Sequence, residues 1–116
     1  MYKRQDQKFV TNAIKIIEEK MPEPSFSVQG LSEELGLSRM QLHRKLKSLT
    51  GLNTTAFMNS IRIEKAIIMF DGGCDRVQEA MDAIGINSYA HFNTLFKKEK
   101  NVTPSKYIEK VKQMKR

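Results

Sequence analysis

The chain has 116 residues, 40% of them apolar and 28% charged, which fits one ordinary globular domain and excludes a disordered or fibrous protein. Its net charge of +7 favours an anionic partner. A single cysteine, Cys74, excludes an internal disulfide. The apolar run 66–70 is too short to span a membrane, and no apolar segment follows the N-terminus. We therefore expect a cytoplasmic protein without membrane contact.

Helix-breaking and helix-capping residues divide the chain into helices, and no segment alternates as a strand would. Helices are expected over about residues 7–21, 28–35, 39–50, 54–70, 76–84, 89–100 and from 104 onward. The predicted N-terminal caps are Asp6, Ser27, Ser38, Asp75, Ser88 and Thr103, and the predicted helix stops include Pro22, Gly36, Gly51 and Gly85. Ser38 and Gln41 have the spacing of a capping box. The sequence therefore predicts an all-α fold of about seven helices.

An internal repeat is the strongest feature of the sequence. Val28, Leu31, Leu35 and Gly36 recur 49 residues later as Val77, Ala80, Ile84 and Gly85. Beyond the turn the offset is 50, and Ser38, Leu42, Leu46 and Lys47 recur as Ser88, Phe92, Phe96 and Lys97. Each copy is a short helix, a glycine turn and a serine-capped helix, which is the pattern of a helix-turn-helix. We therefore expect one unit over residues 1–53, a linker helix over 54–70 and a second unit over 71–116.

The charge is concentrated at the same places. Residues 38–50 carry four basic and no acidic side chains, and residues 97–116 carry eight basic and two acidic ones, whereas the remainder is slightly acidic. Basic clusters of this kind favour nucleic acid as the partner. A solvated basic face explains the charge alone equally well.

The second helix of each unit is the predicted DNA reader, because in a helix-turn-helix this helix enters the major groove. With the apolar positions facing inward, the predicted contacts of the first unit are Ser38, Arg39, Met40, Gln41, His43, Arg44 and Lys47. The predicted contacts of the second unit are Ser88, Tyr89, Ala90, His91, Asn93, Thr94, Lys97 and Lys98. Ser38 and Ser88 open helices whose N–H groups suit a phosphate.

The two predicted readers differ in chemistry. Arg44 suits guanine, Gln41 suits adenine, and Met40 can contact a thymine methyl. The second reader has no arginine among its outward residues, so we expect it to position the backbone more than to discriminate bases.

Other functions have weaker support. Two histidines and one distant cysteine predict no metal site, and no catalytic set stands at suggestive spacing, so we expect neither a cofactor nor an enzyme. Arg62 is expected to form a structural ion pair with Glu64 or Asp71. The alternatives left open are a helical protein-interaction module with a solvated basic face, and an RNA-binding module, which lacks an aromatic stacking platform.

The chain resembles the DNA-binding domain of the AraC family of bacterial transcription regulators over about residues 26–107. The segments that carry the resemblance are residues 26–38, residues 61–66 with Arg62 and Ala66, residues 89–99, and residues 102–107. The segment 42–51 is similar, more narrowly, to the output domains of hybrid two-component regulators. Met81 departs from the family pattern, since a small alanine is usual there.

The resemblance implies a fold and a function. Two recognition helices would enter successive major grooves on one face of double-stranded promoter or operator DNA. By residue matching, the base contacts fall on Met40, Gln41, His43 and Arg44, and on Tyr89, Ala90, Asn93 and Thr94. The family usually activates transcription through RNA polymerase and usually carries a separate sensing or dimerising domain. We therefore expect a monomeric domain from a parent protein that dimerises.

Overall fold

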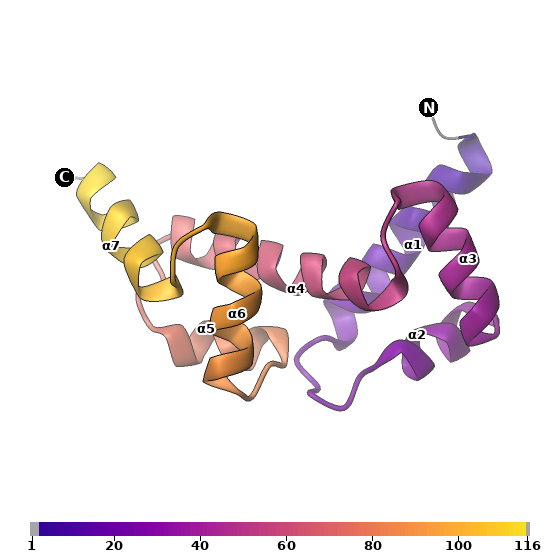
Figure 1. Ribbon diagram of the computed structural model, residues 1–116, viewed down its shortest axis with the longest axis horizontal. Coiled ribbons are helices and arrows are strands. Elements are labelled where there is room, and N and C mark those ends of the chain that lie inside the picture. The colour runs from indigo at the N-terminus through magenta and orange to yellow at the C-terminus, as the bar shows by residue number, and fades with distance from the viewer. Residues whose placement is uncertain (1–2, 116) are drawn as a thin grey trace.

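The computed structural model describes residues 3–115, and this part of the chain forms seven helices without a strand (Figure 1). The helices are α1 (Arg4–Lys20), α2 (Val28–Leu35), α3 (Arg39–Thr50), α4 (Thr54–Asp71), α5 (Val77–Ile84), α6 (Tyr89–Lys100) and α7 (Pro104–Met114). The prediction of an all-α fold with about seven helices is confirmed.

Helix α4 connects two groups of helices, with α1, α2 and α3 toward one end and α5, α6 and α7 toward the other (Figure 1). Its buried side chains join both groups into one continuous apolar core. Phe57 and Met58 lie in its first half, and Phe70 at its far end packs edge-on against Phe96 of α6 with ring centroids 5.7 Å apart. The linker helix is therefore a structural part of both units.

The repeat seen in the sequence is a repeat of backbone geometry. Gly36 and Gly85 end α2 and α5 in the left-handed conformation, with φ of +67° and +73°. The residue after each glycine donates its N–H five residues back, Leu37 to Ser32 at 3.0 Å and Ile86 to Met81 at 3.1 Å. The second turn is one residue longer, since four residues separate α5 from α6 and three separate α2 from α3.

Two predicted helix caps are wrong. Helix α1 begins at Arg4 with Lys3 at its cap, so Asp6 lies inside the first turn, where its charge still favours the positive end of the helix dipole. Helix α5 begins at Val77 with Arg76 at its cap, and Asp75 pairs instead with Lys112 of α7 at 3.4 Å. In both places an acidic residue near a helix start stabilises the structure without serving as the cap.

The end of α4 is fastened to α7 through Asp71. The Tyr107 hydroxyl donates to Asp71 Oδ1 at 2.6 Å, and Lys115 Nζ donates to the Asp71 carbonyl at 2.7 Å. The Tyr107 ring packs edge-on against Phe96 at 5.5 Å. The hydrogen bond to the Asp71 carboxylate, reinforced by burial and by the charges of Asp71 and Glu64, raises the pKa of Tyr107 to about 12.

We expect Tyr107 to ionise late and to weaken the α4–α7 contact when it does. Its pKa is raised in the folded state, so the bond to Asp71 contributes stability fully below the ordinary tyrosine pKa of about 10 and loses it as the pH passes about 12. Phenolate absorbance over an alkaline titration measures this. Asp71→Asn should move the late transition toward the ordinary value, and Tyr107→Phe should remove it. A late transition that persists in Tyr107→Phe would contradict the assignment.

Candidate nucleic-acid interface

Helix α3 presents a mostly polar face to solvent, because its leucines Leu42 and Leu46 are turned the other way and are completely buried. The outward residues predicted from the sequence are all exposed, namely Arg39, Met40, Gln41, His43, Arg44 and Lys47. Met40 is 62% exposed, which is unusual for so large an apolar side chain in a small protein and leaves its thioether free to contact a partner.

The capping box at the start of α3 constrains Gln41. The Gln41 backbone N–H donates to Ser38 Oγ at 3.1 Å, and the Ser38 N–H donates to Gln41 Oε1 at 2.9 Å. The amide oxygen of Gln41 therefore has one of its two lone pairs in use, and its nitrogen is free. A two-bond contact with adenine uses both atoms, so it must share the oxygen with the cap bond or replace that bond.

The three basic residues of α3 that are predicted to contact DNA fall into two groups. Arg39 and Arg44 form no ion pair within residues 3–115, so their guanidinium groups are available to a ligand. Lys47 Nζ instead donates to the Gly51 carbonyl at 3.0 Å, where it satisfies the C-terminal end of α3. Arg44 is consequently the better placed of the predicted base readers.

Helix α6 has the same design with weaker chemistry. Phe92 and Phe96 are completely buried, and Ser88 accepts from the His91 N–H at 3.2 Å. The exposed residues are Ser88, Tyr89, Ala90, His91, Thr94, Lys97 and Lys98, whereas Asn93 is half-buried. The Asn93 amide oxygen is buried without a hydrogen-bond partner.

Thr94 stands where the repeat places Arg44 in the first unit. Its hydroxyl donates to the Ala90 carbonyl at 3.0 Å, one turn back in the same helix. That bond uses the only donor of the side chain, so Thr94 offers a base less hydrogen bonding than its sequence suggests.

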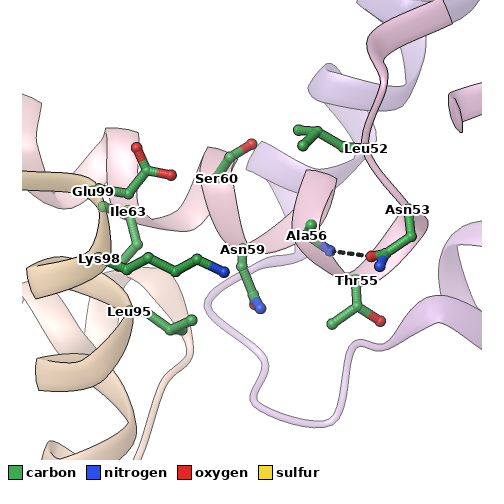
Figure 2. Close-up of a pocket in the computed structure, with 10 residues that line it drawn as sticks. All are labelled: Leu52, Asn53, Thr55, Ala56, Asn59, Ser60, Ile63, Leu95, Lys98 and Glu99. Carbon is green, nitrogen blue, oxygen red and sulfur yellow. Dashed lines mark hydrogen bonds between the residues drawn. The ribbon is translucent and has the colours of Figure 1, made fainter.

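Two adjoining grooves run along the face that carries these helices. One is lined by Arg39, Met40 and His43 of α3 and by residues 53–55 at the start of α4. The other, drawn in Figure 2, lies between α4 and α6 and includes Asn53, Thr55, Asn59, Leu95 and Lys98. Figure 2 shows the Lys98 side chain extending from α6 toward Asn59 of α4. Asn53 and Thr55 line both grooves, so the two grooves adjoin at the start of α4.

Arg62 does not form the predicted ion pair. Its guanidinium, half-buried under the first unit, donates to the Phe26 carbonyl at 2.9 Å, and burial lowers its pKa. Phe26 lies just before the start of α2, so the hydrogen bond joins the linker helix α4 to the segment that leads into α2. The expectation was wrong because the acceptor is a backbone carbonyl 36 residues away, which no local charge pattern reveals.

Other kinds of site have little support in residues 3–115. No three His, Cys, Asp or Glu side chains of this part of the chain come together as metal ligands would. None of its helices is both long and apolar enough to cross a membrane.

Comparison with known proteins places the chain in a family. A family model described as a helix-turn-helix domain matches residues 31–110. The chain is 34% identical to the HTH-type transcriptional regulator MtrA of Neisseria gonorrhoeae over 74% of its own length and 29% of that protein. It is 31% identical to Histidine kinase P4 of Formosa agariphila over 88% of its own length and 7% of that protein. The chain thus spans less than a third of either relative.

The fold has a counterpart among solved structures. The DNA-binding domain of AdpA, a global transcriptional factor solved in complex with a target DNA, superposes with a TM-score of 0.80 at 20% identity, over 90% of this chain and 94% of that one. At that identity the likeness establishes the all-α arrangement of helices.

Proposed function

Because this chain belongs to the AraC-type helix-turn-helix family of DNA-binding transcription regulators, we propose that α3 and α6 read successive major grooves on one face of a duplex. The observation that carries the proposal is the pair of repeated recognition helices, each with a buried apolar side and an exposed polar side, with two adjoining grooves beside them. Successive grooves on one face lie about 34–36 Å apart.

We propose unequal roles for the two helices. In the first unit Arg44 pairs with guanine, the Gln41 amide nitrogen donates to a base acceptor, and Met40 and His43 complete the reading surface, with Arg39 near the phosphates. In the second unit Tyr89, Ala90, His91 and Asn93 contact the groove, while Lys97 and Lys98 neutralise phosphates. The backbone N–H groups beside Ser38 and Ser88 receive a phosphate each.

Salt dependence tests the contact with DNA directly. We expect log K to fall linearly with log salt, by about 0.9 for each neutralised phosphate, because bound cations are released. Lys98→Gln should reduce that slope by about one while leaving the preferred sequence unchanged. Lys15→Gln, on an exposed part of α1, is the matched control and should change neither. A slope near zero for the unaltered chain would exclude backbone contacts of this kind.

A mobility shift separates the proposal from its alternatives. Random duplex DNA at low salt should be retarded by this chain. A helical protein-interaction module would cause no shift, and an RNA-binding module would prefer duplex or single-stranded RNA over DNA of equal length.

The parent protein is proposed to activate transcription through RNA polymerase, in the cytoplasm and in response to a signal sensed elsewhere in its chain. The likeness to a histidine kinase supports output from a two-component system. The isolated 13.4 kDa chain is expected to sediment as a monomer, with any dimerisation supplied by the rest of the parent. Transcription in vitro from a promoter chosen by binding selection tests activation.

A further inference from the structure

The two helix-turn-helix units touch at a second place besides α4. Where the chain leaves α1, the Met21 backbone carbonyl lies directly against Gly85 in the turn of the second unit. A Cβ built on Gly85 would overlap the Met21 oxygen and would lie 3.0 Å from the Met21 carbonyl carbon and 3.2 Å from that of Pro22. Real Cβ atoms essentially never approach backbone so closely, so only glycine fits this position.

The equivalent glycine of the first unit has no such neighbour. Gly36 has the same left-handed backbone, with φ of +67° against +73°, yet a Cβ built on it would meet nothing within 4 Å. Gly36 is exposed, whereas Gly85 is buried. The left-handed turn explains a glycine at both positions, but only the contact with Met21 explains why a side chain is excluded at position 85.

The Met21–Gly85 contact lies in a buried part of the structure. Met21 is 2% exposed, Ile86 beside Gly85 is 6% exposed, and Met81 in α5 is 2% exposed. The repeat places the small, buried Ser32 where the second unit has Met81. Both sides of the backbone contact are therefore buried, while Pro22 next to Met21 is exposed.

The Met21–Gly85 contact completes a ring of packed elements. Helices α1, α2 and α3 pack on α4, and so do α5, α6 and α7. These contacts join the two units only through α4, so a bend or twist of that helix would change the angle between them. The contact from the end of α1 to the turn after α5 joins the two units directly and opposes such a change.

We propose that the Met21–Gly85 contact locks the separation of α3 and α6, so that the protein selects operators by the spacing of their half-sites as well as by their bases. The inference rests on the proposed function, in which both helices bind one duplex. A spacing change of one base pair shifts and rotates one half-site relative to the other, and a rigid reader cannot follow it.

A pair of asparagine substitutions isolates the contact. Asparagine tolerates the left-handed conformation, as Asn101 of this chain does with φ of +62°. Gly85→Asn therefore adds a Cβ against Met21 together with some backbone strain, and Gly36→Asn brings the same backbone strain where there is open space.

The first measurement is independent of DNA. Spin labels at Ser48→Cys and Glu99→Cys, two exposed sites on α3 and α6, are placed in a Cys74→Ser background. Pulsed electron resonance then gives the distribution of distances between the two units. We expect one narrow distribution of distances for the spin-labelled chain without an asparagine substitution and for Gly36→Asn. For Gly85→Asn we expect a distribution that is at least twofold broader, or shifted. Equal distributions for the two asparagine variants would overturn the proposal.

The second measurement uses duplexes from binding selection with one base pair inserted or removed between the half-sites. The unaltered chain and Gly36→Asn should each lose about tenfold in affinity per base pair inserted or removed. Gly85→Asn should bind the best duplex more weakly, and its affinity should vary little across the series. If circular dichroism shows that Gly85→Asn does not fold, the double variant Pro22→Gly/Pro24→Gly loosens the same contact from the other side. An unchanged distance distribution and unchanged spacing preference in that variant would also overturn the lock.

The outcomes distinguish the lock from the proposed function. If the unaltered chain binds no duplex, the proposed function is refuted, and the distance distributions still decide whether the Met21–Gly85 contact fixes the separation of α3 and α6. If the unaltered chain binds duplex with no dependence on spacing, only the proposal about the Met21–Gly85 contact is refuted.

Discussion

Arg44→Ala should weaken binding to the best duplex by about 1–3 kcal/mol, roughly 5- to 150-fold in Kd, and should relax the preference at one base pair. Arg44 is exposed on α3 and forms no ion pair within residues 3–115, so its removal leaves no internal partner unsatisfied. The loss then comes from the interface with DNA and not from the fold. Titration against duplexes altered at each position measures both the affinity and the relaxed base.

Thr94→Ala is the matched control for Arg44→Ala, because the repeat places Thr94 at the equivalent point of α6. Its hydroxyl is already bonded to the Ala90 carbonyl, so we expect a much smaller change in affinity and specificity. Arg44→Lys should keep part of the affinity and lose the base preference, since lysine lacks the planar two-donor fork. Equal affinity of the unaltered chain and Arg44→Ala for duplexes altered at each position would refute the assignment of Arg44 as a base reader.

Phe96→Ala should lower the free energy of unfolding by about 3–5 kcal/mol, the usual cost of removing a fully buried aromatic ring. Phe96 has no exposed surface and packs edge-on against Phe70, Phe92 and Tyr107, with ring centroids 5.5–5.8 Å apart. The cavity would open between α4, α6 and α7, whose aromatic rings meet at this point. Urea unfolding followed by circular dichroism measures the loss.

Tyr89→Ala provides the comparison on the same helix, since Tyr89 is an aromatic residue that is 50% exposed. Its removal should change the free energy of unfolding by about 0.5 kcal/mol or less, although it should weaken DNA binding. A loss for Phe96→Ala no larger than that for Tyr89→Ala would show that α6 is not anchored through this cluster.

Most of the fold could be predicted because the sequence specifies it locally. Gly36, Gly51 and Gly85 end helices in the left-handed conformation, and Ser38, Ser88 and Thr103 accept the hydrogen bonds expected of caps. Of the predictions that failed, Asp6 missed the start of α1 by one turn, and the others depend on distant partners. Asp75 was expected to cap α5, but Lys112 lies close enough to pair with it once α7 has folded back.

The DNA-contacting surface could likewise be predicted only in part. Which side chains of α3 and α6 are exposed follows from helical periodicity, and the exposure of the predicted residues is confirmed apart from the half-buried Asn93. What each polar group still has to offer does not follow from periodicity. Gln41 and Thr94 each form a local hydrogen bond that limits what the side chain can offer DNA, and the Arg62 bond to Phe26 depends on tertiary packing. Their roles at DNA stay predictions.

The contrast between Gly36 and Gly85 limits how this protein can be re-engineered or can drift. The two units look like copies of one module, yet they are not interchangeable parts. The turn at Gly36 faces open space and should accept an asparagine, whereas the turn at Gly85 adjoins the Met21 backbone and leaves no room for a side chain. In a chimaera that carries two copies of the first unit, the turn glycine of the first copy should therefore be replaceable and that of the second should not. Random mutation should be tolerated unevenly across the duplication, with more substitutions accepted in the first turn than in the second.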